Sequence, residues 1–278
     1  MKIHKMGFDI VHGCQLRCVG CPISTLKPKI RYVSITNFYK CLINLDVSEI
    51  FKLRLYNYGE PLLHPELYEI LRAIAVQSWK VKNVEITTNG QYWNTERFVE
   101  AFRLNVVTQL YVSCDGDATP KEYERLRPPA KWKKLIDFLK EMKRLRDEVC
   151  PGMFLGTRTI CTDEKAQKRW KKLLRPLGYT TEFRPWGTRA DAIEQPWGKV
   201  KVPKGICTYL TKEKGRRLYV DYDGTVVPCC VHPRAGVLGN LLENKYSEIL
   251  EGKPRKKFIS TMKKGRKHIP ACVGCQEK

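Results

Sequence analysis

The sequence predicts an α/β fold in which a parallel sheet is followed by a small C-terminal module. Short apolar or β-branched segments alternate with helix-like segments through the first two-thirds of the chain. Proline and glycine then crowd residues 185–205, and a hairpin pattern with clustered cysteines follows. With 278 residues, 42% of them hydrophobic, the chain can bury one full domain and a smaller appendage.

Six segments have the composition of strands, and a helix candidate follows each but the last. We predict strands at 8–12, 50–56, 84–88, 106–113, 153–160 and 180–183, and helices at 34–45, 65–78, 95–102, 131–149 and 163–174. Ser34 and Thr95 are the expected N-caps, and Pro65 suits a first helical turn. Such β-α repeats join parallel strands by right-handed crossovers, and ligands then lie at the carboxyl ends of the strands.

Three cysteines follow the first predicted strand with the spacing Cys-x3-Cys-x2-Cys: Cys14, Cys18 and Cys21. Three thiolates on one loop can hold three irons of a cubane cluster, which normally has four cysteine ligands, so one iron stays open. A zinc loop is the alternative, with His12 as the fourth ligand, although one short loop would then supply the whole shell. A disulfide knot is typical of small secreted domains, and this chain starts without an apolar signal segment.

Polar motifs stand at the ends of the next three predicted strands: Tyr58-Gly59-Glu60-Pro61, Thr87-Thr88-Asn89-Gly90 and Val112-Ser113-Cys114-Asp115-Gly116. Because the carboxyl ends of parallel strands meet at one edge of a sheet, we expect these motifs to lie beside the cysteine loop. The alternative interpretation of Glu60 is an ordinary surface carboxylate, and that of Asp115 is a turn residue before Gly116.

The four motifs, in this order, resemble those of radical SAM enzymes. The resemblance implies a partial (β/α)6 barrel, similar to a TIM barrel, whose cysteine triplet binds a 4Fe-4S cluster. S-adenosylmethionine would chelate the open iron through its amino and carboxylate groups. The implied cofactor contacts are Gly59, Glu60 and Pro61 at the methionine amino group, Thr88 and Asn89 of the third-strand motif, and Ser113 and Asp115 of the fourth-strand motif near the ribose.

Two residues depart from the family pattern, and one more is a candidate contact. Tyr58 replaces the first glycine of the family's Gly-Gly-Glu-Pro, and Gly20 stands where an aromatic residue usually packs near the adenine. Arg158, within the fifth predicted strand, has two interpretations. It pairs with the methionine carboxylate, or it forms a structural salt bridge.

A second cysteine set comprises Cys207, Cys229 or Cys230, and the pair Cys272-x2-Cys275. A zinc ribbon would also satisfy this pattern. The motifs Gly224–Cys229, Leu238–Leu241, Tyr246–Ile249 and Pro270–Cys275, however, resemble the SPASM or twitch extension of radical SAM enzymes. That resemblance implies one auxiliary 4Fe-4S cluster held by Cys207, Cys229, Cys272 and Cys275. Cys230 is the rival of Cys229, because adjacent side chains on a hairpin point to opposite faces. We expect a core at 1–185, a linker at 186–206 and a cluster module at 207–278.

The formal charge of +22 is concentrated in the second half of the chain. Residues 1–120 contain 14 Lys and Arg against 11 Asp and Glu, whereas residues 121–278 contain 37 against 18. Residues 253–267 include eight cationic side chains and no acidic one. Such a patch is either a solvated face or a surface that neutralises the phosphates of a polyanionic partner. Since no apolar run approaches eighteen residues, we expect a cytoplasmic protein without a membrane segment.

The resemblance implies reductive cleavage of S-adenosylmethionine to a 5′-deoxyadenosyl radical that abstracts a substrate hydrogen. A donor such as flavodoxin or ferredoxin would supply the electron. The charge favours a nucleic-acid base or nucleotide as substrate. A ribosomally made peptide, or a small phosphorylated metabolite or sugar, is an alternative, and a non-catalytic zinc-ribbon nucleic-acid binder belongs to a different class. The sequence identifies no catalytic acid or base.

Overall fold

The structure is a computed structural model, and it describes residues 1–186, 207, 217–231 and 235–275. Its centre is a nine-stranded sheet in the order β11-β10-β9-β1-β4-β5-β6-β7-β8. Six neighbouring strands are parallel and follow the chain order: β1 (Lys2–Phe8), β4 (Glu49–Arg54), β5 (Lys80–Thr88), β6 (Gln109–Ser113), β7 (Phe154–Ile160) and β8 (Thr180–Arg184). The predicted partial barrel of six β-α repeats is confirmed. The described strands do not close it, because β8 and β11 are the edges of the sheet.

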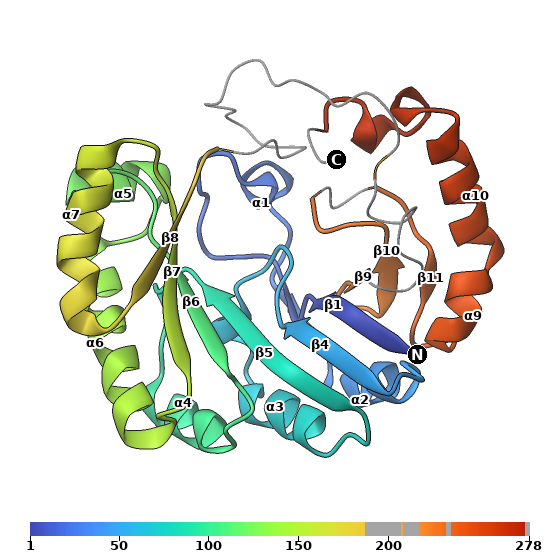
Figure 1. Cartoon of the computed structure of the whole chain (residues 1–278), viewed down its shortest axis with the longest axis horizontal. Helices are drawn as coiled ribbons and strands as arrows, with labels where there is room; N and C mark the ends of the chain where they lie inside the picture. Colours follow the sequence, from blue (N-terminus) through green and yellow to red (C-terminus); the bar gives the residue numbers. More distant parts are fainter. Residues whose placement is uncertain (187–206, 208–216, 232–234, 276–278) are drawn as a thin grey trace.

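Helices cover the outer side of the curved sheet, as Figure 1 shows. They are α2 (Ile35–Ile43), α3 (Leu67–Ala75), α4 (Thr95–Arg103), α6 (Trp132–Val149) and α7 (Glu164–Leu174). In α6 the buried residues recur every three or four positions, which makes one apolar face: Leu135, Phe138, Leu139, Met142 and Leu145. From the sheet, Phe8 packs edge-on against Phe38 of α2. The main core therefore lies between the outer face of the sheet and these helices.

The first predicted strand, 8–12, was wrong in its position. β1 ends at Phe8, whereas residues 11 and 12 form the short strand β2 (Val11–His12), which pairs with β3 (Arg31–Tyr32). Residues 2–5 include two lysines and a histidine, so the sequence did not show that they belong to a strand. In the structure β4 and β9 flank this strand, β1, on both sides. Two short helices were not predicted: α1 (Pro22–Leu26) and α5 (Pro120–Leu126).

Helix starts were predicted with mixed success. Ser34 is confirmed as an N-cap, since its hydroxyl accepts a hydrogen bond from the Asn37 amide at 3.2 Å. Thr95 was wrong, because the cap of α4 is the preceding Asn94, whose side chain accepts from the Arg97 amide at 3.1 Å. Pro65 was also wrong as a first-turn residue: it precedes the N-cap of α3.

In its described residues, the C-terminal part adds three strands and two α-helices to the sheet and its helices. The predicted hairpin is confirmed as β9 (Arg217–Val220) and β10 (Thr225–Val227), followed by β11 (Gly239–Asn240), α9 (Tyr246–Glu251) and α10 (Lys253–Lys263). β9 pairs in parallel with β1, so the hairpin continues the sheet of the partial barrel. The predicted linker lies outside the described residues, apart from Trp186. In the part of the chain that the structure describes, no helix is both long and apolar enough to cross a membrane.

Candidate functional site

The cysteine triplet lies on the loop between β2 and α1. Gly13 and Gly20, which flank Cys14 and Cys18, have φ angles of +97° and +72° that favour glycine. The pKa of Cys14 is raised to about 11 and that of Cys18 to about 12, mainly by burial and partly by the neighbouring cysteines of the triplet. The three thiols are therefore close together, and they would lose their protons when metal binds.

The donor set is three thiolates on one loop, which suits a cubane cluster with one open iron. Among the described residues, no group of three His, Cys, Asp or Glu side chains converges on one metal ion. A cubane binds each thiolate to a different iron, so its ligands stand further apart than those of one zinc ion. All twelve cysteines are free, which excludes the disulfide knot. His12 lies 3.7 Å from the carboxylate of Asp9, and this negatively charged neighbour raises the pKa of the imidazole.

The Gly-Glu-Pro turn packs directly against the cysteine loop. The Glu60 amide donates to the Gly13 carbonyl at 3.0 Å. A Cβ on Gly59 would lie 1.5 Å from the carbonyl oxygen of Val11, so only glycine fits there. Pro61 begins a short 3-10 helix, Pro61–Leu63, that leads away from the turn. Tyr58, by contrast, is compatible with this packing in place of the family's glycine.

Asp9 also holds the Gly-Glu-Pro turn, and this role was not predicted from the sequence. Its side chain is fully buried, and Oδ1 accepts hydrogen bonds from three consecutive amides, those of Asn57, Tyr58 and Gly59, at 3.0, 3.2 and 3.1 Å. A carboxylate that accepts several amide hydrogen bonds fixes the backbone strongly. The only signal in the sequence is an acidic residue within an apolar run.

Glu60 links the turn to the next motif. Its buried carboxylate accepts from the Leu62 amide at 3.2 Å, from the Thr88 hydroxyl at 2.7 Å and from the Asn89 amide at 2.7 Å. Burial raises the pKa of Glu60 to about 7 against the opposing effect of these hydrogen bonds. Asn89 in turn places its Nδ2 3.4 Å from Cys14 Sγ. The structure thus brings the first three predicted motifs together.

The fourth motif is connected to the cysteine loop by a buried ion pair between Asp115 and Arg127. Ser113 ends β6, and two residues later Asp115 forms an ion pair with Arg127 while accepting from the Ile160 amide at 3.0 Å. The Arg17 amide donates to the Pro128 carbonyl at 2.6 Å and the Val19 amide to the Leu126 carbonyl at 2.8 Å, so Arg127 lies beside the cysteine loop. Sequence reasoning missed Arg127 because it follows α5, a helix that was not predicted. Both carboxylate oxygens of Asp115 have partners within the chain, so its contact with ribose stays a prediction.

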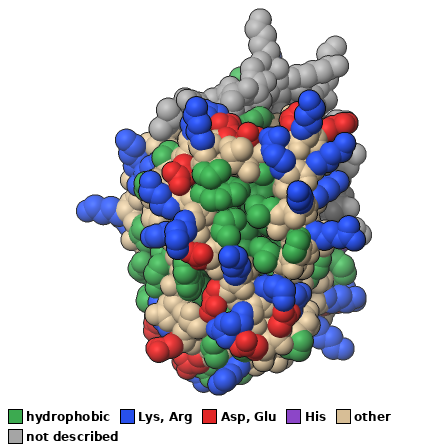
Figure 2. All heavy atoms as spheres, turned by 90° about the vertical axis from the view of Figure 1, so that its left-hand side faces the viewer, with side chains coloured by type: hydrophobic (Ala, Val, Ile, Leu, Met, Phe, Trp, Pro, Cys, Tyr) green, Lys and Arg blue, Asp and Glu red, His purple; other side chains and the backbone are tan. Residues whose placement is uncertain are grey.

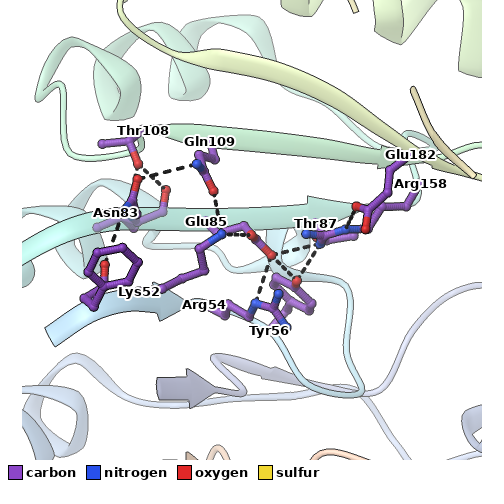
Figure 3. A network of polar contacts seen from close by, with 12 residues as sticks. Lys52, Arg54, Tyr56, Asn83, Glu85, Thr87, Thr108, Gln109, Arg158 and Glu182 are labelled. Atoms are coloured by element: carbon purple, nitrogen blue, oxygen red, sulfur yellow. Dashed lines mark hydrogen bonds and ion pairs between the residues drawn. The ribbon is translucent and has the colours of Figure 1, made fainter. Parts of the chain in front are cut away.

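Arg158 belongs to a network on the inner face of the sheet (Figure 3). Its guanidinium lies 2.8 Å from Glu85 Oε1, and it donates to Tyr56 at 2.7 Å and to Thr87 at 2.6 Å. It also pairs with Glu182 at 3.2 Å. The structural salt bridge is therefore present, and the pairing of Arg158 with a methionine carboxylate stays a prediction.

The second cysteine set is partly assembled. Burial, with smaller contributions from Cys275 and Cys207, raises the pKa of Cys272 to about 11. Cys207 packs against the cluster of Met262, Ile269 and Cys272, and the Cys275 amide donates to the Cys272 carbonyl at 3.3 Å, so these three residues are neighbours. Burial is the main cause of the raised pKa of Tyr58, and Cys229 and Cys230 both contribute to the increase. The choice between them as the fourth ligand stays a prediction.

Comparison with known proteins agrees with this geometry. The radical SAM superfamily model matches residues 9–162, and the SPASM model, an iron-sulfur cluster-binding domain, matches residues 207–276. No curated protein sequence matches the chain. Among solved structures, BtrN in complex with AdoMet and 2-DOIA is similar with a TM-score of 0.59 and 16% identity, over 99% of this chain and 95% of that one.

A second similar structure is native anSMEcpe with bound AdoMet and the Cp18Cys peptide. Its TM-score is 0.69 and its identity 14%, over 94% of this chain and 83% of that one. The superfamily model covers more than half of the chain, on the residues that carry the cysteine loop and its neighbouring motifs. The chain therefore belongs to the radical SAM superfamily, as an enzyme that uses S-adenosylmethionine and a 4Fe-4S cluster and carries a SPASM segment for auxiliary iron-sulfur binding.

Proposed function

We propose that this enzyme abstracts a hydrogen atom from a polyanionic substrate, most simply a nucleotide or a base within a nucleic acid. The cluster and S-adenosylmethionine, when bound, supply a 5′-deoxyadenosyl radical, and a reductant such as flavodoxin or ferredoxin supplies the electron. The chain's own part is to hold these groups and the substrate in place, away from water.

We assign the holding residues from the contacts above. Cys14, Cys18 and Cys21 hold the first cluster, leaving one iron for S-adenosylmethionine. The turn of Gly59, Glu60 and Pro61 stands beside the methionine amino group. Thr88, Asn89, Ser113 and Asp115 line the cofactor beyond it, and Arg127 adds a cation beside Cys18.

We assign the auxiliary cluster to four thiolates, those of Cys207, Cys272, Cys275 and Cys229. The neighbouring thiols of Cys207, Cys272 and Cys275 support this assignment. Cys230 is the alternative to Cys229. Four thiolate ligands would leave the auxiliary cluster no open iron, so it serves electron transfer or structure.

The charge of the surface near the auxiliary cysteines carries the substrate proposal. The lysines of 253–267 are exposed, and among the described residues only Lys256 forms an ion pair, with Glu251 at 3.5 Å. On α6, by contrast, cations pair with carboxylates three or four residues away, as Lys133 does with Asp137. Figure 2, from the side of α7, shows Lys and Arg around a central group of hydrophobic side chains. The exposed lysines at α10 therefore form a largely unpaired basic surface, and α10 packs against Cys272 through Met262.

A peptide substrate is the second candidate. The similar anSMEcpe structures include bound peptides, and a basic surface also suits an acidic peptide. A small phosphorylated metabolite or sugar is a further alternative, since the similar BtrN structure holds a small molecule.

Two experiments test the proposal. Replacing Cys18 with Ala should abolish 5′-deoxyadenosine formation from S-adenosylmethionine under anaerobic reduction, and undiminished formation would overturn the assignment of the cluster. Binding of the reconstituted enzyme to RNA, single-stranded DNA and an acidic peptide should then be compared across a salt series. We expect nucleic acid to bind with a steep salt dependence. Binding to the peptide alone would replace the first candidate with the second.

A further inference from the structure

The inner face of the sheet carries a row of cations. In the strand register, Lys5 of β1 lies opposite Lys52 of β4 on one side and Arg217 of β9 on the other. Arg54 follows two residues after Lys52 and so shares its face. The alternating residues Met6 and Leu53 are buried in the core on the opposite face, where the helices lie. Like charges directly opposite each other repel, so this row costs stability unless negative charge is close.

One buried carboxylate stands within this row. Glu85 is fully buried, and its two oxygens contact Lys52 Nζ at 3.1 Å, Arg54 Nε at 3.0 Å and Arg158 at 2.8 Å, besides the Tyr56 hydroxyl (Figure 3). Those cations hold the pKa of Glu85 at about 2, although burial alone would raise it. Glu85 thus directly contacts three cations, and Lys5 is not among them.

Lys5 is the cation without a partner. Among the residues that the structure describes, no hydrogen bond or ion pair to its ammonium group is found, although the side chain is partly buried. Burial, and then Arg54, lower the pKa of Lys5 to about 8, while Cys230 and Glu85 act in the opposite direction. A partly buried cation among other cations is unfavourable in the free protein. An anion in this position would relieve that cost.

The row lies next to the cofactor motifs. Arg158, bound to Glu85, also donates to Thr87, and the next residue, Thr88, bonds to Glu60 of the cofactor turn. At the other end, Gly7 leaves room for Asn57, because a Cβ there would lie 2.6 Å from the Asn57 side-chain oxygen. A group held by the row would therefore lie close to the residues of the cofactor motifs.

We propose that Lys5, Lys52 and Arg54 bind a phosphate group of the substrate on the inner face of the sheet. Lysines from neighbouring strands act as separate point charges, which suits a tetrahedral dianion better than a planar carboxylate. This inference rests on the proposed function and deepens it. The substrate's charge is recognised beside the reacting group as well as on the outer basic surface at α10.

The test measures the thermal unfolding midpoint of the reconstituted full-length enzyme as inorganic phosphate is added, with chloride keeping the ionic strength constant. Phosphate should raise the midpoint of the wild type. Lys5→Met should need at least about tenfold more phosphate for the same rise, the size of one charge-assisted hydrogen bond. Lys140→Met, an exposed residue of α6 on the outer side, is the matched control and should respond like the wild type. Lys5→Arg keeps the charge and should keep most of the response.

The inference is overturned if Lys5→Met and the wild type respond to phosphate alike. An equal response to acetate overturns the assignment to phosphate. Should Lys5→Met fail to fold, Lys52→Met is measured in the same way and read by the same criterion. The readout does not depend on 5′-deoxyadenosine formation, so the phosphate site and the proposed radical chemistry can fail separately.

Discussion

A substitution of Gly59, which packs closely against Val11, tests how the cysteine loop is held in place. In Gly59→Ala the new Cβ would lie 1.5 Å from the Val11 carbonyl oxygen, which leaves no room without moving backbone by about 2 Å to reach ordinary contact. That movement would break the Glu60–Gly13 hydrogen bond and disturb the three amides that Asp9 holds. At about 1 kcal/mol for a neutral hydrogen bond and about 1.5–3 kcal/mol for one to a charged group, we expect a loss of about 3–5 kcal/mol of unfolding free energy.

The assay is thermal unfolding of the metal-free protein together with iron content after anaerobic reconstitution. A loss of this size corresponds to a fall of roughly 10 °C for a chain of this length. The displaced loop should also bind less iron. Gly152→Ala is the matched control, because nothing lies within 4 Å of a Cβ at that position. The reasoning is refuted if Gly59→Ala melts within about 2 °C of the control and binds as much iron.

Three further predictions concern buried charge and the auxiliary cluster. Glu85→Ala leaves three cations without their carboxylate and should cost at least about 3 kcal/mol near neutral pH. Because the pKa of Glu85 falls from 4.5 to about 2 on folding, that deficit should shrink as pH falls through this window, and a pH-independent deficit in denaturant unfolding would contradict it. Burial, and then Asp9, raise the pKa of Asp221 from 3.8 to about 7, so the folded state holds the proton more tightly. Wild-type stability should therefore fall as pH rises from about 4 to 7, and melting curves of Asp221→Asn should show a smaller fall; parallel curves would count against it. Cys229→Ser should lower the iron content from about eight to about four per chain while Cys230→Ser keeps it, and the reverse result would make Cys230 the ligand.

The sequence predicted those parts of the site whose signal is local. The cysteine spacing, the Gly-Glu-Pro turn and the Thr-Asn-Gly motif each follow a strand, and the rule that carboxyl ends of parallel strands meet was enough to bring them together. Glu60 bonding to Thr88 and Asn89 confirms that convergence. The hairpin was predictable for the same reason, because Asp223-Gly224 is a turn signal between two β-rich runs.

What the sequence could not show depends on pairing between distant segments. Asp9 accepts hydrogen bonds from amides some fifty residues later, and Glu85 of β5 contacts Arg158 of β7 across the intervening strand β6. Neither contact leaves a pattern in the residues around it. Arg127 was missed for a different reason: Pro120–Leu126 is too short a helix to show clear periodicity, so the residue after it had no assigned place.

The pairing of β9 with β1 has a consequence for how the enzyme can be divided. Four register pairs, from Lys5–Arg217 to Phe8–Val220, protect the backbone of β1 on that side. A chain cut before β9 would expose this strand as a bare edge that carries Met6 and Phe8, and such edges recruit other chains into aggregates. The partial barrel therefore depends on its C-terminal segment to protect the edge of β1. The segment that carries the auxiliary cysteines cannot be removed without exposing that edge.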